Sequence, residues 1–108
     1  MKNSVQIIGN VGNQPEVKEL VGGKKVARFS VAMNENHKTK SGEVIRQTSW
    51  YQFVAWGSMA GFVERHVTKG KRIAVEGKLS NRSYEDPSGL KHVITEIVVN
   101  EVLFPSMK

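Results

Sequence analysis

The two tryptophans of this 108-residue chain, Trp50 and Trp56, both lie in the segment TSWYQFVAWG at positions 48–57. Side chains alternate between the two faces of a β-strand, so a strand here puts both indoles on one face and Tyr51 and Phe53 on the other. Aromatic side chains on both faces predict that one face is core and that something outside the monomer covers the other. Nucleic-acid bases stacked on the indole rings are one candidate cover, and a subunit interface is the second.

Positive charge is the second chemical feature of the chain. Lys and Arg number 16 against 10 Asp and Glu, which gives a net charge of +6. Such a balance favours a polyanionic partner. Lys38, Lys40 and Arg46 lie in or beside one polar stretch, and Arg82 and Lys91 lie in or beside another. These groups can neutralise phosphates, in which case binding weakens as the salt concentration rises.

The residues that catalysis or metal binding requires are sparse. The chain has no cysteine, which excludes disulfides and thiolate zinc sites and suits the cytoplasm. Its one aspartate is Asp86, and its three histidines, His37, His66 and His92, are scattered. A Ser-His-Asp arrangement could use only Asp86, which lies in a predicted turn beside Pro87. We therefore expect no enzymatic activity, no catalytic residue, no metal site and no cofactor.

Length and hydropathy predict a single cytoplasmic domain. A chain of 108 residues is long enough for one hydrophobic core and too short for two. No stretch approaches the roughly 18 apolar residues of a membrane span, and the N-terminus carries no apolar signal-peptide core. We therefore expect no membrane partner.

Alternating apolar residues and turn signals predict five strands and one helix. Ser58 is expected to cap a helix of about two to three turns that ends near His66 or Val67, and Gly70 lies where a helix stops. A short extended piece is expected over 16–20, followed by a hairpin turn at 21–24. The five expected strands are Ser4–Val11, Lys25–Met33, Val44–Trp56, Arg72–Leu79 and Lys91–Phe104.

Two polar stretches between strands predict long hairpin arms. The first is NENHKTKSGE at 34–43, and the second runs from 80 to 84 and turns at 86–89. The order strand-strand-strand-helix-strand-strand matches the oligonucleotide/oligosaccharide-binding (OB) fold, a small Greek-key barrel. The predicted fold class is therefore all-β with one short helix, a five-stranded OB-fold barrel with two long hairpin arms. Periodicity alone also fits other small barrels.

Several segments carry a pattern that runs in order over nearly the whole chain. They are NSVQIIGNVG at 3–12 with PEV at 15–17, VARFSVA at 26–32, TSWYQFVAWG at 48–57, KGKRIAVEGKL at 69–79 and TEIVV at 95–99. Together they resemble the bacterial single-stranded DNA-binding proteins. The resemblance implies an OB barrel, usually assembled as a homotetramer, that wraps single-stranded DNA without sequence preference in replication, repair and recombination. It also implies association with the nucleoid.

The resemblance implies which aromatic residues contact DNA. Trp50, Trp56 and Tyr84 match positions on which family members stack bases, and His37 falls where many members carry another aromatic. Each residue also has a simpler interpretation. Either indole could belong to the core, Tyr84 could pack against its own hairpin, and His37 could be a solvated loop side chain.

Two basic positions carry over in the same way. Lys18 and Arg82 match positions expected near phosphates, whereas Gln52 and Ser58 stand where the family often has basic residues, which puts those two contacts in doubt. The lysines at 24, 25, 69 and 71 are interpreted as solvated charge, because lysines are mostly exposed in any protein. The predicted DNA-binding set is Trp50, Trp56, Tyr84, His37, Lys18, Arg82, Lys38, Lys40 and Arg46.

Family members usually continue into a flexible tail with an acidic tip that recruits replication proteins, whereas this sequence stops at FPSMK. We therefore expect an OB domain at 1–105, a short end at 106–108 without an acidic tail, and no tail-mediated partners. A tail-less, dimeric primosomal protein of the same fold, which bridges helicase-loading partners, is the alternative. An RNA-binding barrel is a further alternative, because stacking grooves tolerate either sugar.

Overall fold

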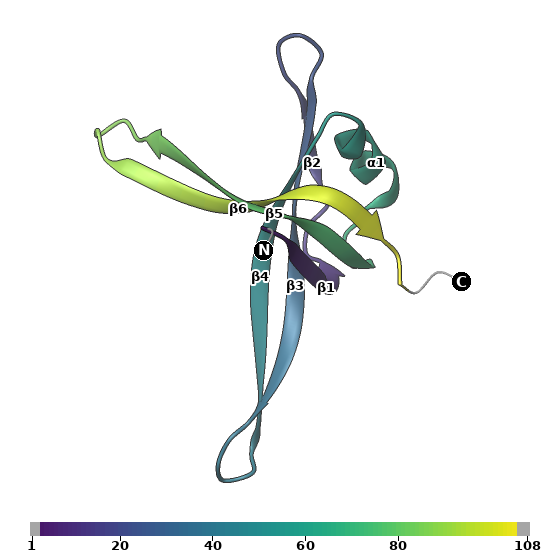
Figure 1. The fold of residues 1–108 in the computed structure, drawn as a ribbon, viewed down its shortest axis with the longest axis vertical. Coiled ribbons are helices and arrows are strands. Elements are labelled where there is room, and N and C mark those ends of the chain that lie inside the picture. Colours follow the sequence, from purple (N-terminus) through teal and green to yellow (C-terminus); the bar gives the residue numbers. More distant parts are fainter. Residues whose placement is uncertain (1–2, 106–108) are drawn as a thin grey trace.

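The computed structural model describes residues 3–105 and shows a mostly β protein with one helix (Figure 1). The predicted end segment at 106–108 lies outside the described residues. Within 3–105, no helix is both long enough and apolar enough to cross a membrane. The elements are β1 (Val5–Val11), β2 (Glu16–Glu19), β3 (Lys25–Lys38), β4 (Val44–Trp56), α1 (Ser58–His66), β5 (Arg72–Glu85) and β6 (Lys91–Leu103).

The strands close into a barrel. Their order is β1-β5-β6-β4-β3-β2, and an additional β1–β3 pairing joins the ends of the sheet. Because β1 and β2 pair with successive parts of β3, they form together the first strand of a five-stranded barrel. β4 and β6 are parallel and the other pairs are antiparallel. This is the Greek-key arrangement of the OB fold, and it confirms the predicted fold class.

Odd-numbered strand residues fill most of the barrel, and Val102 of β6 joins them because the β5–β6 register shifts at Glu76/Gly77. Phe29 and Phe53 face each other across β3 and β4, and their rings stack with centroids 5.3 Å apart. Ala60 and Val63 of α1 join the same buried cluster. Since side chains alternate along a strand, an odd-numbered core leaves the even-numbered side chains on the outside. The other buried strand residues of the cluster with odd numbers are Ile7, Val11, Ala27, Val31, Ala55, Ile73, Val75, Ile97 and Val99.

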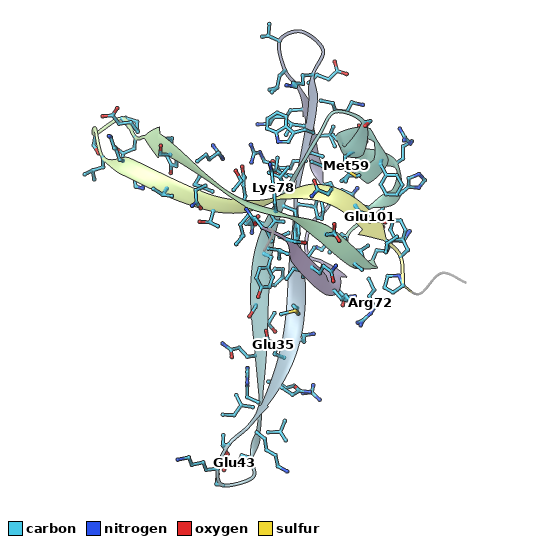
Figure 2. All side chains as sticks on the ribbon, viewed as in Figure 1. Glu35, Glu43, Met59, Arg72, Lys78 and Glu101 are labelled. Carbon is cyan, nitrogen blue, oxygen red and sulfur yellow. The ribbon has the colours of Figure 1, made fainter. Side chains whose placement is uncertain are left out.

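The β3–β4 and β5–β6 hairpins project from the barrel as arms, and the β2–β3 hairpin projects at the end of the molecule opposite the β3–β4 arm (Figure 1). The β3–β4 arm extends the longest axis of the molecule, and Figure 2 shows Glu35 part of the way along it and Glu43 at its tip. The β5–β6 arm leaves the barrel in another direction and turns at residues 86–90. The overall extents are 56 × 45 × 31 Å, so the arms give the molecule a much larger reach than its barrel.

The strands continue further into the arms than their apolar pattern predicts. β3 was expected to end at Met33 and β5 at Leu79, but they end at Lys38 and Glu85. Backbone pairing continues to Lys38 opposite Val44 in the first arm and to Glu85 in the second. The predicted extended piece at 16–20 is the paired strand β2. Cross-strand hydrogen bonds therefore carry both ladders beyond the core.

The helix is present, but its predicted cap is wrong. Ser58 is the first helical residue, and the N-cap is Gly57, which has φ 60° and makes no side-chain capping bond. A positive φ favours glycine, so Gly57 allows the sharp change of direction between β4 and α1. The helix ends at His66, and the backbone N–H of Val67 donates to the carbonyl of Val63.

Candidate nucleic-acid interface

One outer face of the barrel collects most of the predicted aromatic and basic residues. The β3–β4 register places Trp56 opposite Val26 and Trp50 opposite Ala32. Residues paired in a ladder project to the same side of the sheet. The same rule joins Lys18 on β2 to this face through Val26. Arg82, opposite Ile94, and Tyr84, opposite His92, lie on the outward side of the β5–β6 ladder.

Both indoles lie outside the core. Trp50 is 58 % exposed and Trp56 is 39 % exposed, whereas Phe53 and Ala55 of the same strand are buried. Their separation along β4 corresponds to about 20 Å, from a rise of about 3.3 Å per residue. The two rings can therefore contact separate bases of an extended polynucleotide.

Each indole has a defined neighbour. The edge of the Trp50 ring lies against the backbone of Gly12, which has no side chain to displace it. Lys24 Nζ lies 5.8 Å from the centroid of the Trp56 ring, within the range of a cation–π contact. Lys24 was interpreted as solvated charge, and the structure instead places it beside this aromatic position. These contacts hold both rings at the surface.

Tyr84 is exposed on the β5–β6 arm and rests on a histidine. Its ring is stacked on that of His92, with centroids 5.1 Å apart and planes 18° apart. His92 Nε2 also lies 2.7 Å from Asp86 Oδ2. The alternative interpretation of Tyr84, packing against its own hairpin, therefore describes one face of the ring. The residue is still 45 % exposed, which leaves room for a base on the other face.

Asp86 organises the turn of this arm. Its Oδ1 accepts hydrogen bonds from the Ser88 hydroxyl at 2.7 Å and from the Leu90 backbone N–H at 2.9 Å. The Ser88 hydroxyl, His92 and the Leu90 amide, in that order, lower the pKa of the Asp86 carboxyl to about 2. Because the serine donates to Asp86 and not to His92, it is not aligned as a nucleophile beside a histidine base. The contacts build a turn.

The basic residues of the β3–β4 arm divide between its two faces. Arg46 pairs with Asn36, and Lys38 pairs with Val44, on the face that continues from Trp50. His37 pairs with Ile45 on the opposite face, where its Nε2 lies 3.6 Å from Glu35 Oε2. Lys40 lies in the tip. The structure therefore brings Lys38 and Arg46 together with the tryptophan face and places His37 away from it.

Sequence reasoning missed three residues of this face, namely His92, Arg28 and Glu96. Arg28 lies between Val26 and Ser30 on the outward side of β3, and Glu96 lies on the outward side of β6. Strand alternation around Phe29 would have placed Arg28 outside. The contact between Arg28 and Glu96 depends on the order of the strands in the sheet. Neither the sequence of β3 nor that of β6 predicts this order by itself.

A closed five-stranded Greek-key barrel with exposed aromatic rings and basic side chains on one outer face places the protein in the OB-fold class. Residues 2–105 match the family model described as "Single-strand binding protein family". The chain is 38 % identical over 101 residues to "Single-stranded DNA-binding protein 1" of Chlorobaculum tepidum, a match that covers 93 % of this chain and 62 % of that protein. This chain belongs to the single-strand binding protein family.

Comparison with a solved structure also indicates a single-strand binding protein fold. The chain superposes on a structure described as "Plasmodium falciparum SSB complex with ssDNA" with a TM-score of 0.87 and 31 % sequence identity, covering 96 % of this chain and 95 % of that chain. The C. tepidum relative is longer, since this chain spans 62 % of its length. The shared part is therefore the OB barrel with its arms.

Proposed function

We propose that this chain binds single-stranded DNA without sequence preference and protects it during replication, repair and recombination. The observation that carries the proposal is the exposure of Trp50 and Trp56 on one outer face beside basic side chains. Every base has a π-face, so stacking on these rings is sequence-tolerant and contributes about 1–3 kcal/mol per base. The C. tepidum relative and the P. falciparum complex, by their names, support the same ligand.

We assign different contacts with DNA to the arms and to the barrel face. Tyr84 adds a third stacking ring on the β5–β6 arm, while Lys18 and Arg82 neutralise phosphates near the barrel. The other predicted contacts, Lys38, Lys40 and Arg46, lie on the β3–β4 arm and extend the positive surface along it. His37 faces away from Trp50. It can contact the same DNA only if the strand wraps around the β3–β4 arm, and we keep it in the proposed set on that condition.

Binding of this kind breaks no bond, and we propose no enzymatic activity and no cofactor. Among residues 3–105, no group of three or more His, Cys, Asp or Glu side chains could hold a metal ion. The His92–Asp86 pair serves the turn of the β5–β6 arm. The proposed setting is the cytoplasm, in association with the nucleoid.

We propose that the chain acts as a homotetramer. Exposed apolar side chains on the outer side of the barrel support association, among them Ile8 on β1 and Leu103 on β6, which line one shallow pocket together. Native mass spectrometry tests this part of the proposal. Four subunits support the coating protein, and two subunits support the dimeric primosomal alternative.

Titration of the intrinsic tryptophan fluorescence with oligo-dT, with matched oligo-U and with duplex DNA, at low and high salt, tests the function. Quenching by oligo-dT that weakens with salt, with little response to the duplex, is the expected result. Tighter binding of oligo-U would favour the RNA-binding alternative. Absence of quenching by any of these ligands would contradict the proposal.

Alanine variants identify the rings involved. Trp50→Ala and Trp56→Ala should each weaken oligo-dT binding by about 1–3 kcal/mol and leave the barrel folded, since both indoles are exposed. Ile45→Ala is the matched control, because Ile45 is an exposed apolar residue of β4 on the opposite face. Equal affinity of the tryptophan variants and the control would place the DNA elsewhere.

A further inference from the structure

The outer face of the barrel contains a buried carboxylate. Glu96, on β6, is 8 % exposed and is the only charged side chain classed as buried in the described residues 3–105. Taking a carboxylate out of water is costly unless the group is paired and hydrogen-bonded. Glu96 must therefore have partners that compensate its burial.

Two arginines provide that compensation from opposite sides. Arg28 Nη1 donates to Glu96 Oε2 at 2.9 Å, and Arg82 Nε donates to Glu96 Oε1 at 3.2 Å. Arg82 comes from β5, which neighbours β6, whereas Arg28 comes from β3, which is separated from β6 by β4. The β4 residue opposite Arg28 is Val54, which is fully buried. The Arg28 side chain therefore crosses β4 to reach Glu96.

Each guanidinium keeps donors free. A guanidinium has five N–H donors, and within residues 3–105 each of these two arginines has only Glu96 as a side-chain hydrogen-bond partner. The Arg28 and Arg82 side chains are 41 % and 48 % exposed. The two arginines and the glutamate together leave one net positive charge. Free guanidinium donors with net positive charge fit the oxygens of a phosphate.

We propose that Arg28 and Arg82 form one phosphate-binding site on the outer face of the barrel and that Glu96 is the positioning residue that holds both guanidiniums in place. The assignment rests on the proposed function, because the phosphate is one of single-stranded DNA. The strand order β5-β6-β4 places this site between Tyr84 on β5 and the tryptophans on β4. A polynucleotide that contacts both sets of rings crosses it. Ordering the two side chains in advance reduces the entropy lost on binding.

The salt dependence of oligo-dT affinity tests the site in Arg28→Gln, Arg82→Gln and the double variant. Each phosphate contact on a single strand contributes about 0.7 to the slope of log K against log salt concentration. Loss of one contact therefore weakens binding about threefold at 0.2 M salt and about eightfold at 0.05 M. Because the two arginines share one phosphate, each single variant and the double variant should lose the same slope of about 0.7.

Arg72→Gln is the matched control. It makes the same change of charge on the same strand as Arg82, and Figure 2 shows Arg72 at the edge of the barrel beside β1. The control should keep the wild-type slope. A slope in Arg28→Gln equal to that of the control overturns the site, and a loss of about 1.4 in the double variant overturns the sharing of one phosphate.

Glu96→Gln tests the positioning role. The amide keeps the size of the side chain but has one acceptor oxygen, so it cannot accept from both guanidiniums in the same way. At 0.2 M salt, Arg28→Gln should cost about threefold in the wild-type background and less than about 1.5-fold in the Glu96→Gln background. Equal costs in the two backgrounds overturn the positioning role. Glu96→Asp, which withdraws the carboxylate, provides the same comparison if Glu96→Gln does not fold.

Failure of the proposed function gives a different result. In that case the wild-type chain itself does not bind oligo-dT at any salt concentration. Wild-type binding with unaltered slopes in the arginine variants refutes only the phosphate site.

Discussion

Alanine at Gly12 should weaken single-stranded DNA binding without unfolding the barrel. A Cβ at this position would overlap Trp50 Cζ3 and would come within 3.1 Å of Trp50 Cη2 and 3.0 Å of Ser30 Oγ. The backbone of Gly12 does not have the positive φ that would itself strain an alanine. The indole must therefore move, and because Trp50 is largely exposed, it can move into solvent.

The expected effect is set by what the displaced ring contributes. Stacking of one base on an aromatic side chain provides about 1–3 kcal/mol, which corresponds to about 5- to 150-fold in Kd. Gly12→Ala should lose at most as much affinity as Trp50→Ala, since the ring is moved and not removed. The free energy of unfolding should change by less than about 1 kcal/mol, because the collision involves a surface side chain.

Oligo-dT titration at one salt concentration and urea denaturation measure the two quantities. Gly61→Ala is the matched control, because Gly61 lies in α1 and its Cβ would meet only the end of the Arg65 side chain at 3.3 Å. This control should keep wild-type affinity and gain up to about 1 kcal/mol of stability from helix propensity.

Three results would refute the reasoning about Gly12. Wild-type affinity in Gly12→Ala, with weakened binding in Trp50→Ala, would show that stacking tolerates a displaced ring. Wild-type affinity in both variants would remove Trp50 from the site. Unfolding of Gly12→Ala would show that the ring cannot move outward.

Two further predictions concern the core and the β5–β6 arm. Phe53→Ala should lose about 3–5 kcal/mol of stability in urea denaturation, because Phe53 is fully buried and stacked on Phe29; a loss below about 1 kcal/mol would contradict the packing. The pKa of Asp86 is lowered to about 2 in the folded protein, from about 4 for an aspartate in the unfolded chain. The ionised carboxylate therefore stabilises the turn fully above about pH 4. This contribution is lost as the pH falls through the folded pKa of about 2. NMR titration of the Leu90 amide should show this low midpoint, and Asp86→Asn should abolish the transition; a midpoint near an ordinary aspartate pKa would contradict the hydrogen bonds.

The barrel could be predicted from the sequence because its core residues alternate along β3, β4 and β5. Phe29 and Phe53 are separated from their apolar neighbours by outward side chains, and this period of two predicts strands directly. The strand ends were not predictable in the same way. β3 continues to Lys38 and β5 to Glu85, because backbone hydrogen bonds extend a ladder even where no side chain is buried. Hydropathy predicts which side chains are buried, but it does not predict how far the backbones of two strands stay paired.

The candidate site was predictable only where a single strand defines it. Alternation placed Trp50 and Trp56 on one face, and the described structure has them there. The stack of Tyr84 on His92 depends on the register of the β5–β6 hairpin. The contact of Arg28 with Glu96 depends on β3 and β6 lying on either side of β4, a neighbourhood that only the closed Greek-key barrel creates.

The alternation of side chains separates stability from binding over most of this molecule. Odd-numbered strand positions build the core, so even-numbered positions such as Trp50 and Trp56 are free to be chosen for binding. Val26, Val54 and Glu96 depart from this division, because they are even-numbered outward residues that are nevertheless buried. Val54 and Glu96 are buried where Arg28 crosses the sheet. Substitutions there should change stability and DNA affinity together, whereas substitutions at the tryptophans should change affinity alone.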